Sequence, residues 1–529
     1  MTAIKPTIYL VKENITDPKK IFKRDKKVSS TEQDGVLLFY TKSENHTPSW
    51  ANYLSENFKI STDPFVNSSS HAVLIVEVDK RFLAIPLGMG MHLLDMTKID
   101  QNFGLKTALN CIPKSEIRQI DTTTPEVNSQ KTKKQASSGS TPEDFRINKQ
   151  KDILRGITGK LPKDHLLGLS MDGKDSLRLV KDINGLLKLK SLCKTVLTYF
   201  NSDDYKKDYA WIDNIALIRD NSVLEALSKE LAKSLKNGRF ENMLFSPPIF
   251  YELIFDYQGF VFSSGDGSRL SNKDSFVMPD MLDWKKSVGD ARKLITSERL
   301  DSFKVNLIGE EKGMGYSWPL QRCLSWETDL NGYKYILSEG SWYVVASDFF
   351  QTVNDFYIKR IRASTDLPQP IADSQEKDYN LLLSQSNNNR YLFDLGHPTS
   401  SAKSIGSDGN EVCDVYDAST KTFFHLKIGK TSATISHLFR QGAFSGQALK
   451  QDNEMRGQFI QHLVDYGCDK NVIAIPYLPS DYKVVFGLII GRRQKQDIPF
   501  FSKVSFRDTA ENGLELIGYS CSIVYIICP

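Results

Sequence analysis

The sequence predicts a multidomain α/β protein in which α+β units follow one another along the chain. With 529 residues, the chain is too long for one simple core and suggests roughly two to four domains. Strand-like runs alternate with amphipathic helical stretches, and one polar segment near residue 130 interrupts this pattern. We therefore expect an N-terminal α+β domain over 1–120, a flexible polar linker over 121–144, a middle α+β domain over 145–367 and a C-terminal domain over 368–529.

Composition and charge favour a soluble intracellular protein. The hydrophobic fraction of 40% and the charged fraction of 25% are ordinary for a globular chain. The net charge of +4 predicts that any contact with nucleic acid comes from local basic patches. Seven cysteines without a CxxC pair suit a reducing cytoplasm. Because the sequence shows neither a signal-peptide layout nor an apolar run of membrane-spanning length, we expect a cytoplasmic location and no membrane partner.

The N-terminal domain is expected to consist mainly of strands. A short helix is expected over 50–58, where the apolar residues have helical spacing. Gly88 and Gly90 follow the strand expected over 81–86. Because the phosphate-binding patterns GxGxxG and GxxxxGKS are both absent, these glycines indicate a tight turn. Runs of β-branched and aromatic residues predict strands over 7–11, 35–40, 72–78 and 81–86, the last two joined at Asp79-Lys80 as a hairpin.

The segment over 121–144 is rich in Ser, Thr, Gln and Lys and contains almost nothing apolar. This composition predicts a flexible linker or an extended surface arm. Lys131, Lys133 and Lys134 within it offer contacts for nucleic-acid phosphates, although a solvated linker is the simpler interpretation.

The middle domain is expected to combine a helix with a three-stranded meander. Leu224 and Leu235 begin and end a run of leucines spaced by three and four residues, which predicts a packed surface helix over 223–235. Strands are expected over 323–328, 333–337 and 342–346, and Asn331-Gly332 is typical of a hairpin turn. A helix over 347–361 follows.

The C-terminal domain is expected to run helix, strand, hairpin, helix, strand. The first helix is expected over 376–383 and the first strand over 390–394. Two stretches that mix β-branched and aromatic residues, Glu411–Asp417 and Thr422–Lys427, flank a polar loop and predict the hairpin. The domain is completed by helices over 432–442 and 453–466, a strand over 483–490, a basic loop over 491–496 and two closing strands.

The length of the hairpin loop decides where its polar side chains lie. A four-residue loop pairs Asp417 with Thr422 and sets Asp414 opposite His425, with Lys427 diagonally across. A three-residue loop turns Asp414 to the other face of the sheet. Within a regular strand Glu411 faces away from this cluster, and it joins the cluster only at a strand end or a bulge.

With the four-residue loop, the hairpin has the residue types that metal-dependent phosphodiester cleavage requires. A carboxylate holds Mg²⁺ with its remaining waters, and the metal lowers the pKa of a bound water. A lysine neutralises charge that develops in the transition state. The alternative is a solvated strand face, since an isolated Asp with His-x-Lys is a common arrangement.

This pattern resembles the PD-(D/E)xK nuclease superfamily, in which an aspartate on one strand precedes acid-x-lysine on the next. The order of elements is also that of its restriction-endonuclease-like core, a mixed β-sheet flanked by helices. Here His425 stands where the second acid is usual, and imidazole suits Mn²⁺ or Zn²⁺ better than Mg²⁺. The resemblance implies that Glu411 or Glu376 supplies the missing carboxylate and that Gln441 is the helix glutamine that completes such sites.

A second resemblance covers most of the chain. It is similar to a sporadically distributed family of uncharacterised bacterial proteins found near defence and mobile-element genes. The segments that carry this resemblance are EVCDVYD (411–417), FFHLK (423–427), SHLFRQG (436–442), PFFSKVSF (499–506), WPLQRCLSWE (318–327), EGSWYVV (339–345), RFLAIPLGMG (81–90) and FGLKTALN (103–110). The resemblance implies a setting rather than a reaction.

Together these observations predict a divalent-metal-dependent deoxyribonuclease that acts against phage or other foreign DNA, with RNA as an alternative substrate. A non-catalytic nucleic-acid-binding or sensor protein on a decayed nuclease fold is the rival hypothesis, and the histidine substitution favours it. A homo-oligomer or a subunit of a larger defence assembly is a third. The expected residues are Glu376, Glu411 and Asp414 for Mg²⁺ or Mn²⁺, Asp414, His425, Lys427 and Gln441 for catalysis, and Lys430, Arg440, Arg492 and Arg493 for nucleic acid.

Overall fold

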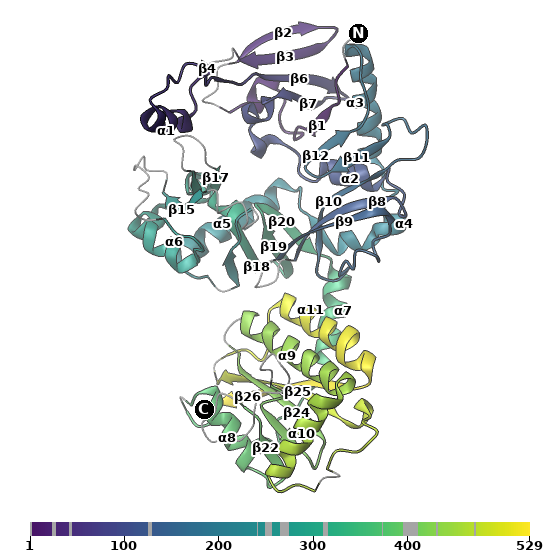
Figure 1. The fold of residues 1–529 in the computed structure, drawn as a ribbon, viewed down its shortest axis with the longest axis vertical. Helices are drawn as coiled ribbons and strands as arrows, with labels where there is room; N and C mark the ends of the chain where they lie inside the picture. The colour runs from purple at the N-terminus through teal and green to yellow at the C-terminus, as the bar shows by residue number, and fades with distance from the viewer. Residues whose placement is uncertain are drawn as a thin grey trace.

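A computed structural model of the chain divides into a larger N-terminal part and a C-terminal domain, drawn in green to yellow in Figure 1. The helix α7 (Ser347–Ile358) lies at the junction between the two. No helix among the described residues is long and apolar enough to cross a membrane. The structure describes residues 3–23, 28–41, 45–124, 130–240, 242–248, 257–264, 275–309, 316–372, 374–394, 411–429, 432–469, 472–492 and 494–529.

A ten-stranded antiparallel sheet dominates the N-terminal part, and α2 (Phe103–Leu109) and α3 (Leu186–Asn201) pack against it. In spatial order its strands are β2 (Ser29–Gln33), β3 (Val36–Thr41), β6 (His71–Val78), β7 (Arg81–Gly88), β1 (Thr7–Leu10), β12 (Ser176–Leu179), β11 (Ser170–Gly173), β10 (Ile153–Lys160), β8 (Ile117–Thr124) and β9 (Gln130–Ser140). Because β1 pairs with β12, the first unit extends past residue 144, and the expected boundary between the first two domains is wrong.

The hairpin expected over 72–86 is present, and so is the helix expected over 50–58. β6 and β7 pair from His71↔Gly88 to Val78↔Arg81, and Asp79 and Lys80 both have positive φ, as a two-residue hairpin turn requires. The helix α1 (Ser49–Phe58) lies between the short paired strands β4 (Asn45–His46) and β5 (Asn67–Ser68). A Cβ at Gly90 would lie 1.9 Å from the Ala72 carbonyl oxygen, so the expected turn is a close approach of two backbone segments.

The expected flexible linker is wrong, because its described residues 121–124 and 130–140 lie in β8 and β9. These strands form a regular antiparallel pair that includes Asp121↔Lys133 and Thr123↔Lys131. Two of its lysines, which were expected to be solvated, make contacts within the protein. Lys131 forms an ion pair with Glu339 at 2.9 Å, and Lys134 donates to the Phe145 carbonyl oxygen at 2.7 Å. Polar composition alone missed this edge strand because its side chains are mostly exposed and need no apolar pattern.

The middle unit contains two smaller sheets that enclose a core around Trp284. The predicted meander is present as β18, β19 and β20, and the predicted leucine helix is α5 (Asn221–Asn237), whose Leu227, Leu231 and Leu235 are buried. The helix α6 (Met281–Val288) completes this core. The sheets are β13 (Ile215–Leu217), β20 (Ser341–Val345), β19 (Tyr333–Ser338), β18 (Leu324–Leu330) and β14 (Met243–Phe245), and β15 (Tyr257–Ser263), β16 (Lys304–Gly309) and β17 (Tyr316–Pro319).

The C-terminal domain has a six-stranded mixed sheet. Four of its strands, β21 (Ile361–Arg362), β26 (Ser520–Cys528), β25 (Lys483–Gly491) and β24 (Thr422–Ile428), run parallel. The other two, β23 (Val415–Asp417) and β22 (Arg390–Leu392), are antiparallel to their neighbours. β21 belongs to this sheet, so the domain begins before Ile361 rather than at residue 368. In spatial order the strands are β21, β26, β25, β24, β23 and β22.

Helices cover both faces of this sheet. Along β25, Phe486 and Leu488 alternate with Val485 and Ile489, and the two sets enter different apolar clusters. The first cluster includes residues of α9 (Ser432–Gln451), α10 (Asn453–Asp465) and α11 (Phe500–Asp508). The second cluster includes Tyr379 and Leu383 of α8 (Glu376–Gln385). The expected order of helix, strand, hairpin, helix and strand is therefore present.

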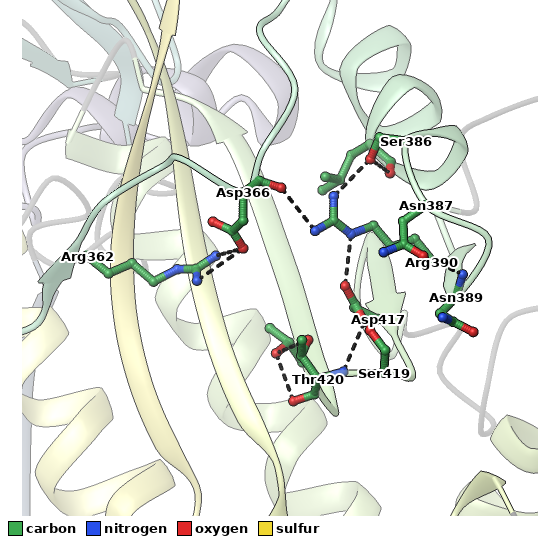
Figure 2. Close-up of polar contacts among 11 residues, drawn as sticks. Arg362, Asp366, Ser386, Asn387, Asn389, Arg390, Asp417, Ser419 and Thr420 are labelled. Carbon is green, nitrogen blue, oxygen red and sulfur yellow. Dashed lines mark hydrogen bonds and ion pairs between the residues drawn. The ribbon is translucent and has the colours of Figure 1, made fainter.

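A buried ion pair fixes the turn of the β23–β24 hairpin (Figure 2). Arg390 on β22 donates to Asp417 at 2.9 Å, and their side chains are 7% and 1% exposed. Asp417 also accepts from the Ser419 hydroxyl and the Thr420 amide, which folds the four-residue loop onto the strand end. The register is therefore Asp417↔Thr422 and Val415↔Phe424, the one on which the functional hypothesis depends.

Candidate functional site

The hairpin brings Asp414 to the edge of β24 near Lys427. Asp414 directly precedes β23, and its amide donates to the Phe424 carbonyl oxygen at 2.9 Å. Its carboxylate accepts from the Leu426 amide at 2.7 Å. The next amide with the same orientation, that of Ile428, donates at 3.0 Å to the carboxylate of Glu376. Two carboxylates thus satisfy the backbone where the short strand β23 no longer pairs with β24.

Glu376 also binds Lys427. The two side chains form an ion pair of 2.6 Å and are 25% and 31% exposed. Glu376 is the first residue of α8, where a negative charge is stabilised by the free amides of the helix start. Burial disfavours the Lys427 charge, but the hydrogen bond with Glu376 prevails and raises the pKa of Lys427.

Two residues that sequence reasoning missed, Asn380 and Asp394, complete this group. Asp394 follows β22, is 8% exposed, and its amide donates to the Asp414 carbonyl oxygen at 3.1 Å. Asn380 lies one helical turn after Glu376 and is 1% exposed. Its amide nitrogen lies 2.9 Å from an Asp394 carboxylate oxygen and 3.3 Å from an Asp414 carboxylate oxygen. Two features of the sequence could have pointed to these residues. Asn380 follows Glu376 by four residues, which is about one helical turn, and Asp394 lies at the end of a predicted strand.

We call Glu376, Asp394, Glu411 and Asp414 the carboxylate cluster. Burial raises the pKa of Asp414 well above its usual value, and the negative charges of Glu411, Glu376 and Asp394 raise it further. The hydrogen bond from Leu426 acts in the opposite direction but does not compensate. Asp414 therefore lies where negative charge accumulates, and a positive charge placed beside it would be stabilised.

Glu411 reaches this cluster because it precedes the regular strand, as the sequence required. It lies in an irregular segment three residues before Asp414, and its charge acts on both Asp414 and Lys427. The Ser445 hydroxyl on α9 lies 2.9 Å from the carbonyl oxygens of both Glu411 and Gln441. These contacts tie the segment of Glu411 to α9.

His425 has a different position from the expected second ligand. It is 4% exposed and packs under α9, where a Cβ at Gly442 would lie only 3.3 Å from its ring. Its ring centroid lies 5.8 Å from that of Phe486. Burial lowers the pKa of His425 to about 4, so the ring is neutral at physiological pH. Among the described residues no hydrogen bond joins this ring to the carboxylate cluster, because α9 packs directly against it.

Of the other described residues expected at the site, the structure places only Arg492 at the same end of the sheet as Lys427. Gln441 lies on α9, where the described contact is that of its carbonyl oxygen with Ser445. Arg492 is exposed directly after β25, at the same end of the parallel strands as Lys427, and Arg440 is exposed on α9. Lys430 and Arg493 lie outside the described residues.

The donor chemistry of the cluster suits a hard divalent cation. Carboxylate and amide oxygens are ligands for Mg²⁺ or Mn²⁺. The buried Asn380 Oδ1 atom has no hydrogen-bond partner among the described residues, although its amide nitrogen contacts two of the carboxylates. Within the described ranges, no three His, Cys, Asp or Glu side chains are grouped closely enough to hold a metal ion as they stand. Glu376 is occupied by Lys427 and Ile428 in this arrangement.

Comparison with known proteins supports the whole-chain relationship and leaves the chemistry open. A model described as "Family of unknown function (DUF6119)" matches residues 6–527. No curated protein and no solved structure matches the chain. The expected relationship to an uncharacterised family over most of the chain is therefore confirmed, without any reaction attached. The chain belongs to the DUF6119 family of unknown function.

Proposed function

We propose that the C-terminal domain is a divalent-metal-dependent nuclease that cleaves DNA. The observation that carries this proposal is the β23–β24 register, which places Asp414 and the Glu376–Lys427 pair on neighbouring amides of one strand edge. A lysine and one acid from the hairpin thereby converge with a second acid from α8, which lies about 40 residues earlier in the chain. A purely structural ion pair would not need the additional carboxylates of Asp394 and Glu411 nearby.

The topology supports the same proposal. The chain runs α8, β22, β23, β24, α9 and β25, with β22 to β24 antiparallel and β25 parallel to β24. This is the order expected of a PD-(D/E)xK core, with Asp414 directly before the second strand and Lys427 next to the last residue of the third. Glu376 on α8 takes the place of the early helix acid.

In this proposal Asp414 and Asp394 hold Mg²⁺ or Mn²⁺, with Asn380 orienting both carboxylates. The metal would supply Lewis-acid activation of a bound water and of the phosphoryl oxygen. Lys427 lies beside Asp414 and stabilises the charge that develops on the phosphate. Glu376 keeps Lys427 in position, and His425 supports α9 by packing rather than by ligation. Arg492 at the same sheet end is suited to a phosphate of the substrate.

Activity on purified protein tests the proposal. Supercoiled plasmid, linear duplex DNA, single-stranded DNA and RNA are incubated with Mg²⁺, with Mn²⁺ and with EDTA. We expect metal-dependent cleavage of DNA, reduced at least about 100-fold by Asp414→Asn and by Lys427→Met. Lys421→Met is the matched control, since Lys421 lies at the other end of the same hairpin and pairs with Asp481 at 3.3 Å. Equal cleavage by all variants, or none by the wild-type protein, would overturn the proposal.

A second candidate is a non-catalytic nucleic-acid-binding protein on a decayed nuclease fold. The observation that favours it is His425, which is neutral and packed where an acid is usual, so one carboxylate of the ordinary set is missing. Titration with Mn²⁺ followed by electron paramagnetic resonance separates the two candidates. The nuclease binds Mn²⁺ and loses this binding in Asp414→Asn, whereas a decayed site leaves Mn²⁺ free in both proteins.

The biological setting belongs to the same proposal. Resemblance to proteins near defence and mobile-element genes suggests invading DNA as the target, with the two preceding units recognising it or restraining cleavage. Plaque counts in a host that expresses the wild-type or the Asp414→Asn protein test this setting. Equal phage titres on both hosts, across a phage panel, would count against it.

A further inference from the structure

A charged cavity lies where the ten-stranded sheet meets the middle unit, away from the carboxylate cluster. Its volume is about 460 Å³, within the range of small-molecule sites. The walls come from the loop after β1, the end of α3, the loop after β13 and the start of β20. The cavity therefore forms only when the two units are assembled.

The lining of this cavity is basic. Lys12, Arg81, Lys106 and Arg219 outnumber its two acids, Glu13 and Asp100. Asp100 is 7% exposed and is already paired with Arg81 at 3.1 Å and with Arg219. The Arg219 side chain is nevertheless 49% exposed, and its guanidinium lies 5.7 Å from the centroid of the Phe200 ring. Arg81 also pairs with Glu13 at 2.7 Å, and Lys106 pairs at 3.0 Å with Asp203, which does not line the cavity. The lining itself therefore keeps more positive than negative charge.

A second, apolar chamber opens from the same walls. Its volume is about 200 Å³, and it shares Lys106, Leu217 and Arg219 with the first. The aromatic residues Tyr205, Trp211 and Tyr343 line it. Asp152 and Asp213 add carboxylate acceptors, which already accept from the Thr124 and Tyr205 hydroxyls, and Asn102 and Lys149 are further polar residues of this wall. Lys106 and Arg219 therefore stand at the junction between a cationic chamber and an aromatic one.

We propose that this composite cavity binds a nucleoside phosphate. Lys106 and Arg219 face the phosphate, because a guanidinium and an ammonium are the usual partners of phosphate oxygens. The base occupies the aromatic chamber, where flat rings are favoured by stacking. Asp152 and Asp213 accept hydrogen bonds from ribose hydroxyl or exocyclic amino groups. The proposal stands independently of the nuclease, since no residue of the carboxylate cluster lines either chamber.

Isothermal titration calorimetry of the full chain in EDTA tests this site. ATP, GTP, AMP and GMP are titrated, with adenosine and inorganic tripolyphosphate as the two halves of the ligand. We expect one nucleotide per chain with a dissociation constant below about 1 mM, and at least tenfold weaker binding of either half alone. Absence of binding by all four nucleotides, or tripolyphosphate binding as tightly as the best nucleotide, would overturn the assignment.

Variants locate the binding. Lys106→Met and Arg219→Gln each weaken nucleotide binding about tenfold or more, because each removes a charged phosphate contact. Ala216→Phe fills the aromatic chamber and weakens nucleotide binding while tripolyphosphate binding is unchanged. Lys229→Met on the exposed side of α5 is the control for lost charge, and Asp414→Asn shows independence from the carboxylate cluster. If one variant fails to fold, the others decide, and wild-type affinity in every folded cavity variant contradicts the proposal.

Discussion

Two aspartates of one hairpin, Asp414 and Asp417, show how position decides the behaviour of a carboxyl group. Burial disfavours the charge of both. At Asp417, hydrogen bonds from Ser419 and Arg390 prevail, and the pKa is lowered. At Asp414, one amide opposes burial and three further acids, so the pKa is raised. The first aspartate is a structural ion-pair partner, and the second is the residue to which the proposed nuclease assigns the metal ion.

Asp414→Asn is expected to increase the free energy of unfolding of the metal-free protein at pH 7.5. The folded-state pKa of Asp414 is raised, so its contribution to stability is present below the unfolded pKa and is lost as pH rises through the folded pKa. Asparagine removes the charge that causes this loss. Thermal unfolding in EDTA measures the effect, where 1 kcal/mol corresponds to roughly 2–4 °C for a domain of this size.

Asp417→Asn is the matched comparison and should act in the opposite direction. The pKa of Asp417 is lowered, so its contribution is present above the unfolded pKa and is lost as pH falls through the folded pKa. A rise in melting temperature for Asp417→Asn at pH 7.5, or a fall for Asp414→Asn, would contradict this account of the hairpin.

His425→Leu is expected to make the protein less sensitive to acid without abolishing cleavage. The pKa of His425 is lowered to about 4 by burial, so the wild-type protein loses stability as pH falls from the ordinary histidine value of 6.5 towards 4. Leucine cannot take up that proton. Unfolding is measured at pH 7.5 and 5.0, and cleavage at pH 7.5. Complete loss of Mn²⁺ binding in His425→Leu would show that the imidazole is a ligand after all.

At the scale of elements, the hairpin and its neighbour β22 form one unit whose register positions the site. The sequence predicted the order of elements and, for a four-residue loop, the convergence of Asp414 with Lys427, because alternation along a strand is a local rule. The structure decided for the four-residue loop over the three-residue one. The sequence did not predict that Asp394 and Asn380 belong to the site. These residues reach the carboxylate cluster only because β22 pairs with β23 and α8 packs against the sheet. For the same reason the sequence placed His425 beside the acids, although α9 covers that face of the strand.

Arg390→Met is expected to destabilise the C-terminal domain by about 3–5 kcal/mol, because it leaves the Asp417 carboxylate buried without its cation. Chemical denaturation measures this cost. The double variant Arg390→Met with Asp417→Asn should lose less than the sum of the two single variants, since the buried charge is then absent. Additive losses would show that the two side chains do not interact energetically, and the hairpin register would need another explanation.

At the scale of the whole molecule, the C-terminal domain is held to the middle unit by both apolar and polar contacts. Phe500 and Val504 of α11 join a cluster with Val345 and Val353. Glu327 of β18 accepts from the amides of Phe500 at 2.7 Å and Phe501 at 3.3 Å, so it caps a helix of the other domain. This contact makes the first turn of α11 dependent on the neighbouring unit.

Glu327→Ala is expected to weaken this contact by about 0.5–2 kcal/mol, the usual cost of losing a helix cap. Limited proteolysis near α7, followed by mass spectrometry, measures the change as faster separation of the two parts. Asp329→Ala is the control: Lys334 pairs with Glu327 at 3.2 Å and with Asp329 at 2.8 Å, but it is Glu327 that accepts from the amides of α11. Identical cleavage rates for both variants would assign the domain contact to the apolar cluster alone.

By itself, the sequence determined the local order of this protein: the hairpins and the leucine helix follow from alternation, helical spacing and turn residues. Only the tertiary structure decided that residues 130–140 are an edge strand, that β1 pairs with β12, and that Asp394 and Asn380 join Asp414. These facts rest on contacts between segments far apart in the chain. Periodicity within one segment reports which face is apolar, but not which distant segment covers it.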